Sequence, residues 1–563
     1  MTVNRDWTAA ARRSSRRRFL RGSVGLTAGS AAAILLACSS DDTTEDAGST
    51  TSSSAATGTT AAATGETPKR GGRLMLNIAT TTNNNSPFAD WNQGFVLLGQ
   101  TVYDRLLSTR PGKEYVLEAA QSVEVPDPTT VIFKLKPGLK YHDRAPVNGR
   151  AVSSEDVVKT QYHIRDNTRA VHRNFQDLYL QTAEAPDAQT VVYRLKSPSA
   201  YLFSGTLLAN GSAQCIVPAE QLDSIETAWP VGSGPYQLTE FEQNVRYVYR
   251  RFDGFREAAG NMPLIDERQV TTLIDQPAQE AAFRSEQLHV WAVPNFSTLE
   301  PVRRDMGARI VADEWPSLGM WTLALNGTKA PWNDVRVREA IYRLTNRQQY
   351  LDLISDGKGM VTPGTLSAGL TDYQLDPTET EKYWRQDPRE AKQLLDAAGF
   401  PYDKEVEMLV IQGGLNPQAG EIFQQQVSQA GIKARVVQMP FAEWLGSRVT
   451  PGNWETWVAS HPAYDTPQIA LRQQHTTTNS GHRVSGLKDP EVDKLIEKSE
   501  VTLDRNERIE QVKDIQIQLL EKYTPFMFLF SPTVFQARWN FVQDWENNPA
   551  TNPMYRVEAW LDK

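Results

Sequence analysis

The spacing of the side chains that could hold a metal or perform catalysis supports neither role in this chain, and its many carboxylates are too common to be informative. His461, His475 and His482 fall within one segment, but the intervals fit no compact metal-ligand motif, and no Cys or carboxylate completes a set. Gly-x-Ser-x-Gly, His-Glu-x-x-His and a phosphate-binding glycine loop are all absent from the sequence. We therefore expect no metal, no cofactor and no catalytic residue.

The first forty residues indicate export from the cytoplasm. Arg16 and Arg17 lie in Ser-Arg-Arg-Arg-Phe-Leu-Arg (15–21), which is typical of a twin-arginine signal. The apolar run 22–37 is too short to span a membrane stably, and it ends in Leu-Leu-Ala-Cys. That ending resembles the lipobox of bacterial lipoproteins, in which Cys38 would carry the lipid. We expect a signal peptide over 1–37; the alternative is a basic arm with an incidental Cys.

Composition extends this prediction to the mature chain. Residues 38–68 are rich in Ser, Thr, Ala and Gly, and such a segment serves as a flexible tether. We expect a protein lipid-anchored to the outer face of the cytoplasmic membrane, in the periplasm or cell envelope. The first 37 residues hold seven arginines and one acid, a net charge of +6, and the whole chain carries −8, so the remainder carries −14. That acidity argues against binding to nucleic acid.

The size of the mature chain and its cysteines limit the architecture. About five hundred residues are too many for one hydrophobic core, so two or three lobes are expected. If Cys38 is lipidated, Cys215 has no partner, and the chain forms no internal disulfide. Cys215 has no neighbouring His or Lys in sequence, and it is most simply a small buried apolar residue.

Two similar strands are predicted sixty residues apart in the first half of the chain. A Pro-Asp turn precedes a run of β-branched and aromatic residues at 126–136 and again at 186–196. Between them, a helix near 153–166 begins at Ser153 or Ser154, with acids in its first turn. We interpret the two runs as strands of one lobe.

The second half alternates helices and strands. One helix with a single apolar stripe is expected from Asp334 to Ile354, and Asp387 is expected to cap a short helix that Pro388 begins. A strand over 406–411, a helix over 418–430 and a strand over 432–438 form a βαβ unit, so these two strands should pair in parallel. Asp489 opens another helical stretch, and 526–530 is a short buried strand.

Six motifs occur in an order that resembles a known family. Together they resemble the extracellular solute-binding proteins of the oligopeptide, dipeptide and nickel type, which feed ABC importers, and the resemblance covers essentially the whole mature chain. The motifs are Gly71-Gly72-Arg73-Leu74, Tyr103-Asp104-Arg105-Leu106-Leu107, the run 134–143, Ser154-Glu155-Asp156-Val157-Val158, Gly232-Ser233-Gly234-Pro235-Tyr236 and the run 331–341.

This resemblance implies an α/β fold of two hinged lobes, like the periplasmic binding proteins, with an additional α+β domain inserted in lobe I. Lobe I would comprise 69–110, 213–296 and 531–563, the inserted domain 111–212, and lobe II 297–530. The resemblance further implies a monomer that closes on a peptide or other small molecule and presents it to the permease subunits of an ABC transporter. Because His142-Asp143 falls in one of the shared motifs, its role is expected to be structural.

The same resemblance suggests ligand-binding residues in a Trp-containing stretch over 457–467. In peptide-binding members, an Asp in this region holds the α-ammonium group of the peptide. Here the matching position is Ala463 or Ser460, depending on the alignment, and only Asp465 could substitute. Either a ligand without a free amine or an amine met by Asp465 from another angle is consistent with this departure. Trp457, His461 and Tyr464 belong to the same candidate site.

Three further residues are candidates for contact with the ligand. Trp321 lies in a strand that enters lobe II beside the cleft in relatives, where it would line the site or pack in the core. Phe95 precedes the motif at 103–107, and Asn85 ends an Asn run in a loop after the first strand. The rival functions are a tethered sensor that uses the same cleft and, less favoured, an exported hydrolase.

Overall fold

A computed structural model describes residues 67–79, 85–88, 101–110, 113–167, 170, 173–205, 207–209, 214–461, 463–475, 489–545 and 557–563. All of them belong to one compact unit, Thr67–Lys563. The predictions for Arg16, Arg17, Cys38, the tether and Phe95 lie outside the described residues. Among the described helices, none combines the length and apolar character needed to cross a bilayer.

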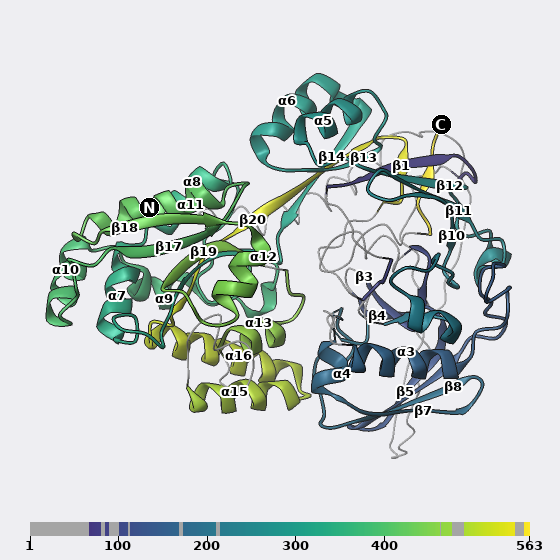
Figure 1. Ribbon diagram of the computed structural model, residues 1–563, viewed down its shortest axis with the longest axis horizontal. Coiled ribbons are helices and arrows are strands. Elements are labelled where there is room, and N and C mark those ends of the chain that lie inside the picture. The colour runs from purple at the N-terminus through teal and green to yellow at the C-terminus, as the bar shows by residue number, and fades with distance from the viewer. Residues whose placement is uncertain are drawn as a thin grey trace, which may run out of the picture. The chain divides into compact units, whose positions relative to one another are not determined.

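Lobe I is built on a four-stranded sheet of order β1-β12-β11-β10 (Figure 1). β1 pairs in parallel with β12, whereas β11 is antiparallel to both of its neighbours. Helices α5 and α6 pack against the same core as this sheet. The lobe's elements are β1 (Arg73–Ile78), β2 (Asp104–Arg105), β9 (Cys215–Ile216), β10 (Tyr236–Glu242), β11 (Arg246–Arg251), β12 (Glu267–Thr272), α5 (Gln276–Arg284), β13 (Val290–Val293), α6 (Phe296–Met306), β14 (Ile310–Pro316), β21 (Val542–Gln543) and β22 (Trp560–Leu561).

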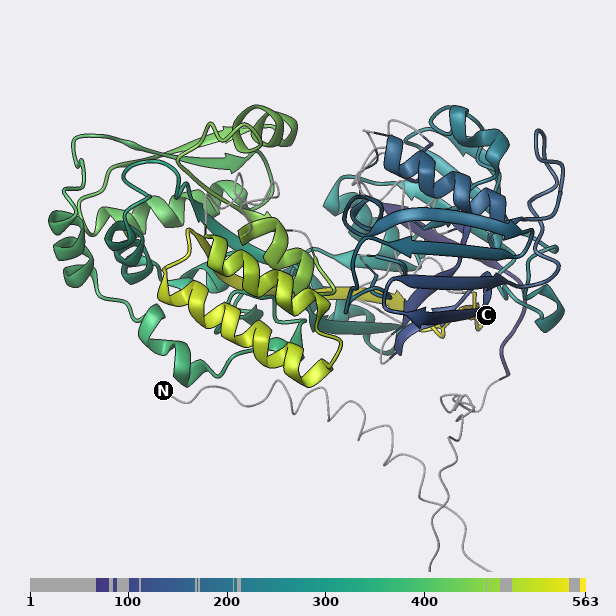
Figure 2. The same ribbon diagram turned by 90° about the horizontal axis from the view of Figure 1, so that it is seen from below.

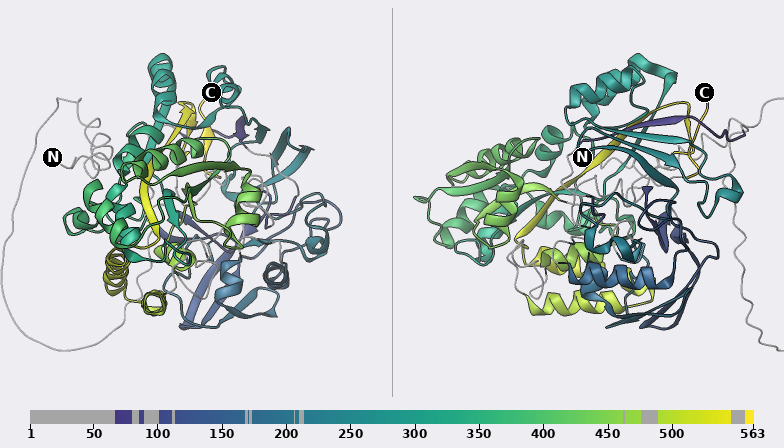
Figure 3. Two further views of the ribbon diagram at one scale, coloured as in Figure 1. Left: turned by 60° about the vertical axis from the view of Figure 1, so that its left-hand side comes forward. Right: turned by 45° about the vertical axis from the view of Figure 1, so that its right-hand side comes forward.

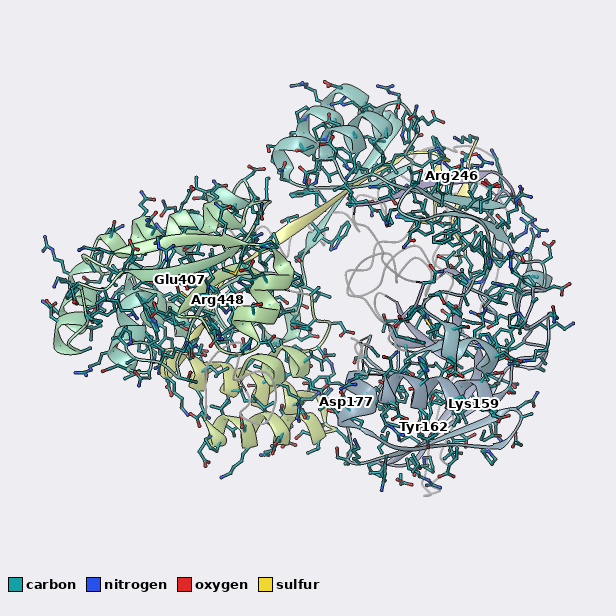
Figure 4. All side chains as sticks on the ribbon, viewed as in Figure 1. Lys159, Tyr162, Asp177, Arg246, Glu407 and Arg448 are labelled. Carbon is teal, nitrogen blue, oxygen red and sulfur yellow. The ribbon has the colours of Figure 1, made fainter. Side chains whose placement is uncertain are left out.

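The inserted domain is a four-stranded antiparallel sheet of order β5-β6-β8-β7, with α3 covering it (Figure 2). Its elements are β3 (Leu107–Arg110), β4 (Lys113–Leu117), β5 (Ala120–Asp127), β6 (Thr130–Leu135), α3 (Ser154–Asp166), α4 (Asn174–Leu178), β7 (Leu180–Asp187) and β8 (Thr190–Leu195). On the sheet-facing side of α3, the Tyr162 hydroxyl donates to the Ala183 carbonyl at 2.9 Å (Figure 4). The two predicted strands and the helix between them are confirmed.

The sequence similarity of the two strands reappears as a pseudo-twofold symmetry. β6 and β8 pair directly, and both hairpin turns carry an Asp whose carboxylate accepts a backbone N–H two residues further on. Across the central pair, Lys134 donates to the Thr190 hydroxyl at 2.6 Å, and Arg194 donates to the Thr130 hydroxyl at 2.8 Å. The repeat therefore specifies equivalent positions on two adjacent strands.

Lobe II is an α/β layer around a sheet ordered β20-β15-β19-β17-β18. β17 is parallel to both β18 and β19, so the predicted βαβ unit is confirmed, with α11 as its helix. The lobe's elements are β15 (Met320–Leu325), α7 (Val335–Leu344), α8 (Arg347–Ile354), β16 (Gly359–Met360), α9 (Pro377–Trp384), α10 (Pro388–Ala397), β17 (Val406–Ile411), α11 (Asn416–Ser428), β18 (Ala434–Met439), α12 (Phe441–Glu443), η5 (Trp444–Val449), β19 (Thr456–His461), α13 (Pro467–His475), α15 (Pro490–Val501), α16 (Arg505–Glu521) and β20 (Phe526–Trp539).

The structure divides two helices that were expected to be continuous. The stretch from Asp334 to Ile354 forms α7 and α8, because Asn346 caps a new helix and accepts the Gln349 N–H at 3.0 Å. Likewise, the stretch that Asp489 opens is divided into α15 and α16, and Asp504 caps the second helix. The caps at Asp387 and Asp489 are where the sequence predicts them.

Strand β20 belongs to both lobes. The segment 526–530 is a buried strand as predicted, but it continues for nine more residues to Trp539. Its first half pairs with β15 in lobe II, and its second half pairs with β13 and β14 (Figures 1 and 3). Because α6 and β14 share the lobe I core, the expected boundary at 297 is displaced to about 317, where the chain passes from β14 to β15.

Candidate functional site

The direction of β20 identifies which edge of the lobe II sheet faces lobe I. β20 leaves lobe II after Phe530, toward lobe I. Both β19 and β20 pair antiparallel with β15, so β19 and β20 run in the same direction. The carboxyl end of β19 therefore also faces lobe I. His461 ends β19 there, and Tyr464 and Asp465 follow. The carboxyl ends of strands in open α/β sheets are where ligands bind. The loop after β19 is therefore the candidate functional site.

Trp457 packs in the core behind this loop. Its ring lies 5.3 Å from the ring of Trp444 and 5.5 Å from that of Phe526, and only 1% of Trp457 is exposed. Helix η5 supplies Trp444, and an ion pair between Arg448 of η5 and Glu407 of β17 holds this helix on the sheet (Figure 4). Trp457 thus packs in the core next to the strand end from which the loop begins, and its side chain is not exposed at the site.

His461 and Tyr464 extend this aromatic layer toward the edge. The His461 ring lies 5.5 Å from the Phe526 ring and 5.7 Å from the Tyr464 ring, and His461 is half-buried. Tyr464 is buried, and burial raises the pKa of its hydroxyl well above the usual value. Next to them, Ser460 and Ala463, the two positions that match the amine-binding acid, are exposed and uncharged.

Asp465 contacts the inserted domain. Its Oδ2 accepts the backbone N–H of Gly205 at 2.6 Å. Asp465 also lies in the wall of a cavity of about 970 Å³ between the inserted domain and lobe II. The cavity is lined by Thr109, Val125, Pro128, residues 199–204, residues 369–373, Asp465, Thr466, Leu503, Arg505 and Arg508. Among the predicted ligand-binding residues that the structure describes, Asp465 alone is part of this lining.

Further contacts between the inserted domain and lobe II surround a buried ion pair. Arg472 and Glu500 form a salt bridge, and burial raises the pKa of the Glu500 carboxyl. The backbone carbonyl of Glu500 accepts the N–H of Ala200 at 2.7 Å. The side-chain amide of Gln468 donates to the Tyr179 hydroxyl. Sequence reasoning does not identify these residues, because the partners across the two domains lie hundreds of positions apart and no local pattern marks them.

Trp321 and Asn85 have local structural contacts. Trp321 is buried on β15 with its ring stacked 6.1 Å from that of Phe530, in the core that α7, α8 and α11 share. Core packing, one of its two expected roles, is thus present, and contact with a ligand stays a prediction. The Asn85 side-chain amide donates to the Ala228 carbonyl at 3.1 Å, which fixes a loop of lobe I.

His142 joins two of the sequence motifs. Gly232 N–H donates to His142 Nδ1 at 3.3 Å, so Nε2 carries the proton and donates to the Gly234 carbonyl at 3.2 Å. Burial lowers the pKa of His142 to about 4, so the ring is neutral at pH 7. This bonding confirms that the motif at 142–143 is structural.

The described part of the chain contains no group of three or more His, Cys, Asp or Glu placed to hold a metal ion. His475 ends α13, and His482 lies outside the described residues. Cys215 is buried, and burial raises the pKa of its thiol to about 12, in agreement with an apolar packing role.

Comparisons with known proteins identify the family. The family model described as bacterial extracellular solute-binding proteins, family 5 Middle, matches residues 114–482. The dipeptide-binding protein of Escherichia coli (strain K12) is 24% identical over 464 residues, which cover 77% of this chain and 84% of that protein. The oligopeptide-binding protein AppA of Bacillus subtilis, solved with a nonapeptide, has a TM-score of 0.73 at 18% identity and covers 88% of this chain and 100% of its own.

A third relative was solved with a ligand that is not a peptide. The protein MoaA from A.tumefacien R10, in complex with mannopinic acid, has a TM-score of 0.72 at 22% identity and covers 88% of this chain and 100% of its own. These structures share the α/β fold described above. Because the family model matches well over half of the sequence, this chain belongs to the bacterial extracellular solute-binding proteins of family 5.

Proposed function

We propose that this protein is the substrate-binding component of an ABC importer, which captures a peptide-like or other small solute between its lobes and delivers it to a membrane permease. The observation that carries the proposal is the sharing of β20 between the lobes. Within the described residues, the polypeptide passes between lobe I and lobe II only twice, near 317–319 and near 531–533. Two adjacent crossings form a hinge about which lobes close on a ligand.

The solute class is the open part of this proposal. One relative is named a dipeptide-binding protein, a second was solved with a nonapeptide, and a third was solved with mannopinic acid. In this chain, Ser460 and Ala463 are uncharged, so the loop after β19 offers no acid at the matching positions. We propose that recognition here does not depend on an ammonium group held at those positions.

Ligand-dependent stability tests the proposal. The purified protein is melted alone and with mixtures of di- and tripeptides, of sugars, and of amino-acid–sugar conjugates. A ligand at one hundred times its Kd adds about 2.7 kcal/mol to the free energy of unfolding, so one mixture should raise Tm by several degrees. No rise with any of the mixtures would contradict the proposal. Recovery of the solute in altered form would instead favour a hydrolase.

Transport and sensing differ in cells. A transport receptor predicts that deletion of the gene abolishes uptake of the solute that raises Tm. Normal uptake after deletion, together with a lost response to that solute, would favour the tethered sensor. We further propose that the protein is exported through Arg16 and Arg17, is anchored by lipid on Cys38, and works as a monomer without a cofactor.

A further inference from the structure

A hydrogen bond with no assigned role joins Asp465 to Gly205. These residues belong to lobe II and to the inserted domain, 260 positions apart in sequence. A carboxylate that accepts a backbone N–H at 2.6 Å forms a charge-assisted hydrogen bond, which is stronger than one between neutral groups. The bond therefore contributes to holding the two domains together.

The lack of a side chain at position 205 leaves space for this carboxylate. A Cβ atom added to Gly205 would lie 2.7 Å from Asp465 Oδ2 and 3.6 Å from the Thr109 hydroxyl. The first distance is shorter than real Cβ contacts, so a side chain at 205 would displace the carboxylate. Glycine at this position leaves room for the carboxylate, and a Cβ atom there requires the carboxylate to move away from its present place.

The neighbouring contacts fix the same two surfaces against each other. The N–H of Ala200 donates to the backbone of Glu500 at 2.7 Å, and the Arg508 guanidinium lies 5.1 Å from the centre of the Tyr201 ring. The segment 199–204 and Asp465 also line the cavity between the domains. Asp465 therefore lies at a junction made by protein groups on both sides.

We propose that Asp465 is a closure latch, which holds the inserted domain against lobe II through Gly205 and does not bind an amine of the solute. This inference rests on the proposed function and specifies its ligand chemistry. A solute of this receptor then needs no free amine for Asp465 to recognise. Closure is stabilised in part by a bond that is independent of the solute.

Amide hydrogen exchange at residues 201–205 tests the latch in the full chain without a ligand. Asp465→Asn and Gly205→Ala should each increase exchange there about tenfold, and the double variant should add little, because both changes remove one bond. Asp372→Asn is the matched control, since Asp372 lines the same cavity but pairs with Arg505 of its own lobe at 2.6 Å. Unchanged exchange in Asp465→Asn, or fully additive effects, would overturn the inference.

A pair of peptide probes separates the latch from an amine-binding role. Ala-Phe and N-acetyl-Ala-Phe are titrated into the wild-type chain and Asp465→Asn. The latch predicts that Asp465→Asn weakens the binding of both peptides by the same factor. It is equally satisfied if neither peptide binds and Asp465→Asn still increases amide exchange at 201–205. A loss confined to Ala-Phe would overturn it. If every ligand fails but the exchange result holds, the proposed function fails and the latch stands.

Discussion

At the scale of single residues, burial determines what the titratable groups of this protein can do. His142 and His289 are both held neutral, because burial lowers each pKa to about 4. In the unfolded chain a histidine has a pKa near 6.5, so the unfolded state binds more protons between these values. The contribution of these two histidines to the free energy of unfolding is therefore at its maximum above about pH 6.5, and it is lost as the pH falls from 6.5 to 4.

The substitution His142→Gln measures one of these contributions. The free energy of unfolding of the wild-type protein should fall by about 3 kcal/mol per histidine between pH 6.5 and 4. His142→Gln should be less stable at pH 7, but its curve should fall less steeply, because the contribution of His142 is lost. Urea unfolding of both proteins across this pH range provides the comparison. Parallel curves would show that His142 is not buried in neutral form.

Residue types could be interpreted correctly where the pattern is local. The buried, unreactive character of Cys215 follows from its neighbours in sequence, whereas the structural role of His142 follows from its place in a motif shared with the family. The role of Asp465 could not be predicted, because its partner is a backbone N–H on a distant segment. Trp321 was ambiguous for the same reason, since a buried strand looks alike whether one face borders a core or a cleft.

At the scale of elements, helix boundaries depend on caps more than on apolar stripes. The stripe from Val337 to Ile354 runs through the break between α7 and α8. Asn346 makes the break favourable, because its side chain caps α8 and its backbone bonds to the Gln426 side chain. A continuous stripe is therefore compatible with two helices that pack on one core.

Asn346→Ala tests this account of the break. Loss of the cap should reduce the free energy of unfolding by about 1 kcal/mol. Asn333→Ala is the control, because Asn333 is exposed just before α7 and caps nothing, so it should change stability by less than about 0.5 kcal/mol. Equal effects of the two substitutions in chemical denaturation would contradict the role of the cap.

Strand β20 shows how a strand end can be misjudged. Ser531 and Pro532 follow the apolar run, and proline interrupts a ladder of hydrogen bonds, so the sequence predicts an end there. In the fold, the carbonyl of Pro532 accepts the N–H of Ser317 at 3.0 Å. At this point β20 stops pairing with strands of lobe II and begins to pair with strands of lobe I. The proline is tolerated because the pairing changes at that point.

At the scale of the whole molecule, the proposed export and lipid anchoring would come before any binding of a solute. Arg16→Lys with Arg17→Lys should retain the protein in the cytoplasm, if the twin-arginine route carries it. If the lipid is attached to Cys38, as proposed, Cys38→Ala should instead release the exported chain from the membrane. Cell fractionation with an antibody distinguishes these results. Membrane retention of Cys38→Ala would disprove the lipid anchor.

The arrangement of lobes could be predicted only through the order of the motifs. Local patterns give the βαβ unit and the paired strands, whereas the joining of distant segments in lobe I leaves no periodic signal. The sequence places the boundary at 297 and not near 317 for that reason: α6 and β14 continue the alternation typical of lobe II, yet they pack on the lobe I core.

The most direct test of the solute-receptor account is the native mass of the protein purified from cells that make it. The account predicts a mass above that of the chain by one small solute, which denaturation releases and which rebinds after refolding. The chain mass alone, both on purification and after exposure of the refolded protein to a low-molecular-mass extract of those cells, would contradict it.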